Sequence, residues 1–181
     1  MKKIGLLLLI LMIQNCKAQV TFSLQTLIGH SISTKNLVPF KMATGFGPGL
    51  TLGNSEQFAV KISGEFLYMQ PKYSLTEKQS SRTISLGLLW SPIKEKPQFT
   101  IELHGLRGRL LVSQNPDALP TSWNIVKTST WDQWGYRVNA AYNIKEWLAI
   151  TVGYSRFCQS KFDPNNFQSI ITIGMNFQVT L

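Results

Sequence analysis

The sequence predicts an all-β protein: an eight-stranded antiparallel up-and-down transmembrane β-barrel. Three observations predict it. Apolar and polar residues alternate with a period of two through most of the chain, as along a strand with one apolar and one polar face. Only 15% of the 181 residues are charged, well below the roughly 25% of soluble domains. No run of about 20 apolar residues offers a membrane-spanning helix.

The first segment, residues 1–18, has the features of a secretory signal peptide. Two lysines precede a ten-residue apolar core over 4–13, and Cys16 and Ala18 place small residues at the cleavage site. As a helix this core spans about 15 Å, which is too short to cross a bilayer. We therefore expect cleavage after Ala18, with acylation of Cys16 as the alternative, and a single barrel domain over 19–181.

Eight segments of the mature chain share the alternating pattern. Each places large apolar residues at every second position and bounds them with turn-forming residues, which is typical of half-buried strands. The segments, each with two apolar residues, are 19–30 (Phe22, Leu24), 44–52 (Phe46, Leu50), 57–69 (Phe58, Ile62), 82–91 (Ile84, Leu86), 98–109 (Ile101, Leu103), 132–142 (Tyr136, Val138), 147–157 (Ile150, Val152) and 169–181 (Ile171, Ile173).

The second segment differs from the others because Pro48 lacks an amide donor and lies among glycines. A bulge or distortion is expected there. The connections alternate in length, which favours an up-and-down meander whose last strand closes on the first. Long connections are expected at 31–43, 70–81, 110–131 and 158–168, and short ones at 53–56, 91–97 and 143–146.

The polar face of the strands is mostly Gly, Ser, Thr, Asn and Gln, as in Thr151 and Gly153. These side chains are too small and uncharged for a typical soluble exterior. They suit the narrow lumen of an eight-stranded barrel, which side chains fill, while the large apolar face suits lipid. A soluble β-barrel or sandwich is the alternative.

Aromatic residues of the apolar face cluster at strand ends, as in the two girdles of an outer-membrane barrel. With the first strand starting in the periplasm, Phe22, Phe58, Trp90, Phe99, Tyr142 and Phe177 fall near the periplasmic rim, and Phe46, Tyr68, Trp134 and Tyr154 near the outer rim.

The last segment carries the most specific pattern. From Ile171 to Leu181 every second residue is apolar, and Thr172-Ile173-Gly174-Met175-Asn176-Phe177-Gln178-Val179 runs polar-x-Gly-x-x-hydrophobic-x-hydrophobic. This stretch resembles the final strand by which small outer-membrane barrels of the OmpA/OmpX type are recognised for insertion, and the resemblance covers 19–181. It implies that fold, a bacterial outer-membrane location and the insertion machinery as a partner. That family includes adhesins, structural anchors and lipid A enzymes.

The charged residues separate by position on this topology. The inward phase carries both signs, which we expect to pair because an unpaired ion in a confined lumen is costly. The excess of basic residues falls on the outer side, opposite in sign to lipopolysaccharide phosphates. The lumenal polar network is predicted to be Lys61, Glu65, Glu102, His104 and Arg137.

Arginines continue the lipid-facing phase at the outer ends of several strands. Near the interface an outward Arg costs about 0–1 kcal/mol, and there its guanidinium can bind phosphate. A bulge at Gly105 or Gly108 would reverse the phase of Arg107 and Arg109. The predicted lipopolysaccharide-binding belt is Arg82, Arg107, Arg109 and Arg156.

These features predict a structural or surface-interaction protein of the outer membrane, a monomer that contacts lipids including lipopolysaccharide. The alternatives are a lipid A-modifying hydrolase, for which His30 and His104 are the available histidines, and a narrow solute channel. We expect no enzyme activity, because no matching acid accompanies His30 with Ser31 and Ser33. No cofactor or metal motif is present. Nucleic-acid binding is disfavoured because the basic residues face the outside of the cell.

Overall fold

The computed structural model describes residues 19–35, 40–54, 57–71, 77–93, 98–114, 128–160 and 163–181. The predicted signal peptide and Cys16 lie outside the described residues, so cleavage and acylation remain predictions. No helix in the described ranges is long and apolar enough to cross a membrane. The strands are β1 Gln19–Lys35, β2 Phe40–Asn54, β3 Phe58–Pro71, β4 Glu77–Trp90, β5 Phe99–Gln114, β6 Thr128–Lys145, β7 Leu148–Ser160 and β8 Asp163–Thr180.

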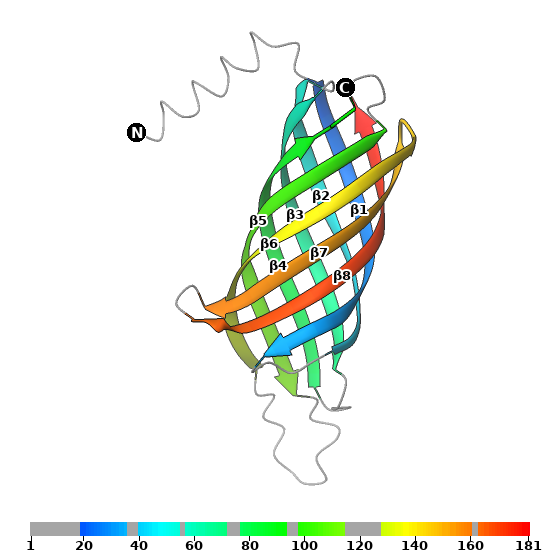
Figure 1. Cartoon of the computed structure of the whole chain (residues 1–181). Coiled ribbons are helices and arrows are strands. Elements are labelled where there is room, and N and C mark those ends of the chain that lie inside the picture. Colours follow the sequence, from blue (N-terminus) through cyan, green and yellow to red (C-terminus); the bar gives the residue numbers. More distant parts are fainter. Residues whose placement is uncertain are drawn as a thin grey trace.

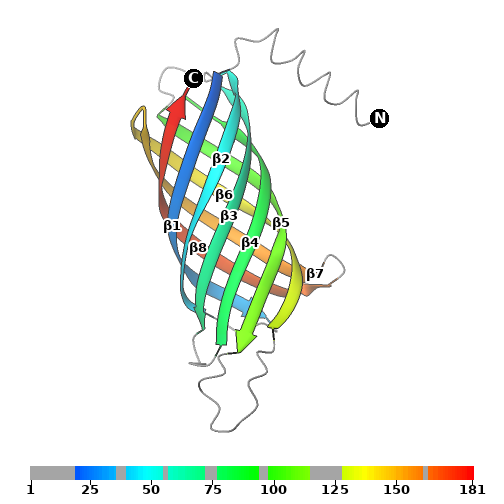
Figure 2. The same ribbon diagram turned by 180° about the vertical axis from the view of Figure 1, so that it is seen from behind.

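The eight strands form one closed barrel in which every strand pairs antiparallel with its neighbours in sequence (Figures 1 and 2). β8 closes on β1, with Ile28 opposite Ile173. The predicted fold class is therefore confirmed. β1 begins and β8 ends at the same end of the barrel (Figure 1). We call this the termini end, and the opposite end the loop end.

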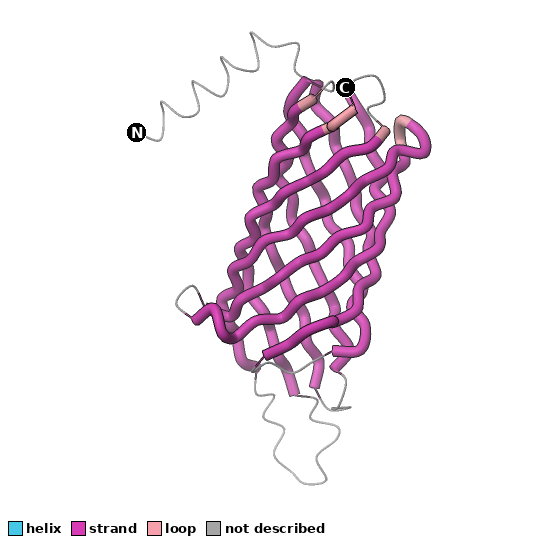
Figure 3. The backbone as a smooth tube through the Cα atoms, in the orientation of Figure 1, coloured by secondary structure: helices cyan, strands magenta, loops and turns pink. Residues whose placement is uncertain are grey.

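The strands extend further at the loop end than the sequence predicted. β1 continues to Lys35, β6 begins at Thr128 and β8 begins at Asp163 (Figure 3). Strand pairing continues into the extensions of β1 and β8 across register shifts at Ser31/Ser33 and Cys158/Ser160. The predicted connections 31–43, 70–81 and 158–168 are therefore largely wrong. Backbone pairing continues beyond the segments of regular alternation because the ladder hydrogen bonds do not depend on side-chain polarity.

The distortion predicted at Pro48 takes a different form from a bulge. The register between β2 and β3 is the same at Phe46–Phe66 and at Gly49–Ser63. Pro48 pairs with Leu24 of β1, whereas β3 has no register partner for it. The ladder is interrupted because proline cannot donate a hydrogen bond, but no residue is inserted.

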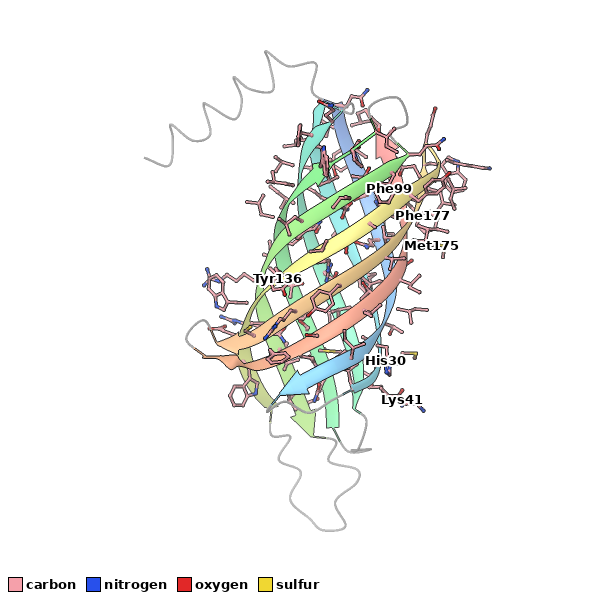
Figure 4. All side chains as sticks on the ribbon, in the orientation of Figure 1. His30, Lys41, Phe99, Tyr136, Met175 and Phe177 are labelled. Carbon is pink, nitrogen blue, oxygen red and sulfur yellow. The ribbon has the colours of Figure 1, made fainter. Side chains whose placement is uncertain are left out.

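The two faces of the barrel wall have opposite character. Outward residues are large and apolar, including Ile84 and Ile173, each at least 60% exposed. Many inward residues are small or polar, including Ser155 and Thr151, although a cluster of large apolar side chains also points inward nearer the loop end. In Figure 4, Phe99 and Phe177 lie toward the termini end, at the rim where the sequence placed them. Apolar residues outside and polar residues inside are the reverse of a soluble barrel.

Candidate functional site

Inside the lumen, Glu65 of β3 and Arg137 of β6 form a bidentate ion pair. Nη2 of Arg137 donates to Oε1 of Glu65 at 2.6 Å, and Nη1 donates to Oε2. Nε of Arg137 donates to Oγ of Ser155 at 2.7 Å. Because both ionic side chains are almost fully buried, this pairing is needed to offset the loss of water around each charge.

The other lumenal charges gather around Glu102 of β5. Lys61 Nζ lies 3.2 Å from Oε1 of Glu102, while His104 Nε2 and Asn139 Nδ2 each lie 3.0 Å from Oε2. The structure thus brings together all the residues predicted for the lumenal network, as two groups. Asn139 and Ser155 were missed, because a neutral polar residue at an inward position is too common to single out.

A chain of hydrogen bonds continues from His104 to the neighbouring strands. Oγ of Ser85 lies 3.3 Å from Nδ1 of His104, and Oγ of Ser63 lies 2.6 Å from Ser85. Ser85, His104 and Glu102 therefore form a serine–histidine–carboxylate series. Each of the three is at most 5% exposed, and Glu102 is also held by Lys61. The series faces the lumen and is arranged to fill it, away from the outer wall that a lipid would touch.

Glycines on the inward phase make room for this network. A Cβ atom at Gly87 would overlap the His104 ring, and one at Gly153 would overlap Oδ1 of Asn139. At these two positions the lumen is therefore packed too closely to accommodate an added Cβ atom.

His30 lies within β1, and the strand continues through Ser31 and Ser33, which the sequence placed in the first long connection. Its ring is exposed on the outer wall, and Nδ1 lies 2.5 Å from the backbone oxygen of Lys41. Both residues lie toward the loop end in Figure 4. Ser31 follows His30 on the strand and points to the opposite face. Among the described residues, no group of three His, Cys, Asp or Glu side chains is suited to hold a metal ion.

An apolar cluster fills the lumen nearer the loop end. Its side chains, from six of the strands, are at most 4% exposed and lie beside buried polar side chains such as Gln133 and Gln168, so packed side chains close the outer part of the lumen. The cluster consists of Leu27, Phe40, Ala43, Leu67, Met69, Leu106, Leu110, Phe157 and Ile170.

The termini end of the lumen holds a cavity of about 750 Å³. It is lined largely by neutral polar residues such as Gln19, Thr51, Gln57 and Asn143. The lumen thus has a polar mouth at the termini end and an apolar plug toward the loop end.

The arginines predicted for the outer rim all lie on the outward phase. Pairing of β5 with both neighbours runs without a register shift, so Gly105 and Gly108 host no bulge. Leu106 and Leu110 point inward and are buried, which leaves Arg107 between them on the outer wall. Arg82, Arg107 and Arg109 are exposed, and Arg156 is half-buried.

Three of these arginines lie over aromatic rings. The guanidinium carbon of Arg82 lies 5.9 Å from the ring centre of Phe66. The corresponding distances are 4.7 Å from Arg107 to Trp134 and 3.9 Å from Arg156 to Phe167. Such contacts hold a cation at an apolar surface while leaving its N–H groups available.

Arg109 has a different partner and a like-charged neighbour. Its Nε lies 3.6 Å from Oδ1 of Asp132, and both side chains are more than 70% exposed. In the register, Arg109 stands directly opposite Arg82. Like charges directly opposite each other on neighbouring strands destabilise a sheet. An anion held between the two would offset their repulsion.

The structure brings three of the predicted arginines together and leaves the fourth apart. Arg82, Arg107, Arg109 and Asp132 line one groove of about 1100 Å³ on the outer wall of β4, β5 and β6. Arg156 lies on β7, opposite Tyr136, and is not part of the groove lining. The predicted belt is therefore a cluster plus a separate arginine.

No protein-family model and no curated protein matches the sequence. Solved structures do match. The attachment invasion locus protein Ail of Yersinia pestis superposes with a TM-score of 0.56 at 12% identity, over 90% of this chain and 97% of that chain. Ail has also been solved with the heparin analogue sucrose octasulfate, and this structure matches with a TM-score of 0.54 at 14% identity, over 90% and 99% of the chains.

Two further barrels match over nearly the same length. The N-terminal β-barrel domain of Pseudomonas aeruginosa OprF has a TM-score of 0.53 at 6% identity, over 88% of this chain and 97% of that chain. Neisserial surface protein A has a TM-score of 0.51 at 12% identity, over 90% and 97%. The chain therefore has the fold of the small eight-stranded outer-membrane barrels, and the likeness covers 97–99% of those chains.

Proposed function

We propose that this protein is a bacterial outer-membrane barrel with a structural role at the cell surface, where its loop-end arginines hold lipopolysaccharide phosphates without performing chemistry. The termini end then faces the periplasm. The observation that carries this proposal is the outward phase of Arg82, Arg107, Arg109 and Arg156. A guanidinium at that position reaches phosphate oxygens and can bind them bidentately.

Further observations support the proposal. The opposed pair Arg82 and Arg109 favours an anion between them. Ail, a barrel of the same fold, has been solved with a highly sulfated sugar, which is a polyanion like the phosphorylated sugars of lipopolysaccharide. Insertion through the β8 motif by the outer-membrane machinery, cleavage after Ala18 and a monomeric state belong to the same proposal.

The test replaces Arg82, Arg107, Arg109 and Arg156 together with Gln and measures thermal unfolding in two membranes, one containing lipopolysaccharide and one free of phosphate. We expect the wild-type protein to gain stability from lipopolysaccharide and the variant to lose most of that gain. Lys145→Gln is the control, because Lys145 lies over Trp147 in the turn between β6 and β7 at the termini end. If the wild-type protein gains no more than the four-arginine variant, the arginines are only a solvated rim.

A further inference from the structure

The groove on the outer wall has a charged part and an apolar part. Its charged part is formed by Arg82, Arg107, Arg109 and Asp132. Ile84 and Leu86 continue the lining along β4 away from the loop end, and both are more than 60% exposed. A cluster of net positive charge that leads into an apolar trough matches an anionic headgroup with a hydrocarbon chain.

The trough exists because a side chain is missing from the wall. Gly105 lies on the outward phase between Leu86 of β4 and Tyr136 of β6. A Cβ atom built on Gly105 would meet only Leu86 O, at 4.0 Å. Packing within the barrel therefore does not require glycine at this position. Glycine weakens a strand, and one reason for a glycine in a strand is the close approach of another molecule.

The charges above Gly105 are arranged at two heights. Arg82 and Arg109 stand opposite each other, and Arg107 lies two residues further along β5 toward Gly105. In the described part of the chain, Asp132 is the carboxylate that contacts this cluster, through Arg109. Arg82 and Arg107 lie over aromatic rings, and their N–H groups can donate to phosphate oxygens.

We infer that this groove is a single binding site for one phosphorylated glycolipid of the lipid A class, with phosphate held by Arg82, Arg107 and Arg109 and one acyl chain lying over Gly105. The inference rests on the proposed function and places the lipid-binding site on the outer wall of β4, β5 and β6. Lipid A fits better than a phospholipid because it carries a phosphate at each end of its disaccharide, and the arginines offer donors at two heights. The groove lies toward the loop end, which the proposed orientation places in the outer leaflet, where lipid A is found.

The experiment fills the trough and leaves the arginines in place. Gly105→Leu and, as a milder change suited to a strand, Gly105→Val place a side chain where the acyl chain would lie. Ala140→Leu is the matched control, because Ala140 is an exposed position of β6 on the outer wall that does not line the groove. Retention of lipid A by the purified barrel in detergent is measured by native mass spectrometry, with phosphatidylglycerol as the competing phospholipid. Electrophoretic migration before and after boiling verifies folding.

We expect the wild-type protein and Ala140→Leu to retain one lipid A in preference to phosphatidylglycerol. Gly105→Leu should bind it about tenfold more weakly, equivalent to losing contact with roughly two methylene groups. If Gly105→Leu and Gly105→Val bind like the wild-type protein while Arg82→Gln/Arg107→Gln/Arg109→Gln loses binding, the rim proposal stands and the groove inference is wrong. If the arginine variant also binds normally, both are wrong. Equal loss in Ala140→Leu, or preference for phosphatidylglycerol, would also overturn the inference.

Discussion

Arg137 donates to both oxygens of Glu65 and to Ser155, so three of its donor groups have acceptors inside the lumen. Removing one member of such a pair leaves the other charge buried without compensation, which costs more than the pair contributes. Arg109 and Asp132 form the opposite case, since both are exposed and exposed pairs contribute little. The same chemical pairing therefore has different consequences on the two faces of the wall.

We predict that Glu65→Ala lowers the free energy of unfolding by about 3–5 kcal/mol, because Arg137 stays buried and unpaired. The double variant Glu65→Leu/Arg137→Met should recover most of the loss. Asp132→Asn, in phosphate-free membranes, should change it by less than about 1 kcal/mol. Denaturant titration of the folded barrel in lipid vesicles measures all three. A Glu65→Ala loss no larger than that of Asp132→Asn would contradict buried pairing.

Neighbouring strands fit together through positions where one strand has no side chain. Gly87 of β4 stands opposite His104 of β5, and its missing Cβ is the space that the imidazole ring occupies. Gly64 of β3 lies on the outward phase, where a Cβ atom would meet nothing within 4 Å. These two glycines look alike in the sequence, but only the inward one is required by packing between strands.

We expect Gly87→Ala to destabilise the barrel by about 1–3 kcal/mol, because the new methyl group displaces His104 from Glu102. Gly64→Ala is the matched control and should leave stability unchanged or raise it by about 0.4–1 kcal/mol, because the unfolded chain loses freedom while nothing clashes. Thermal unfolding of both variants in the same vesicles compares them. Equal destabilisation by both would show that the loss comes from the strand and not from the His104 contact.

The sequence predicted the elements better within the apolar band than beyond it. Alternation from Ile171 to Leu181 indicates both the existence and the phase of β8, because lipid on one face and lumen on the other demand a period of two. The extension of β1 from Ser31 to Lys35 has no such signal, since polar residues pair equally well there. The outward phase of Arg107 follows from alternation, but its grouping with Arg82 and not with Arg156 depends on register and strand tilt, which alternation does not determine.

Across the whole molecule the lumen contains two different barriers in series. From the termini end, a polar mouth of about 750 Å³ leads toward the paired charges around Glu102 and Arg137. Nearer the loop end, buried side chains such as Leu67, Met69 and Phe157 pack into an apolar plug. An ion that reached the charged layer would have to displace paired side chains, and beyond it would meet packed apolar side chains and buried polar groups that already bond to one another, as Ser81 does to Gln133.

We therefore predict that the purified protein carries no stable ion current in planar bilayers at ordinary voltages. Phe157→Ala should remain silent, because the Arg137–Glu65 pair still closes the charged layer. Glu65→Ala should also remain silent, because the apolar plug is unchanged. Variants confirmed as folded and inserted by their migration before and after boiling provide the comparison, with a known porin as the positive control. A steady current from the wild-type protein would establish a continuous pore, and a current from only one of the single variants would show that its layer is the sole barrier.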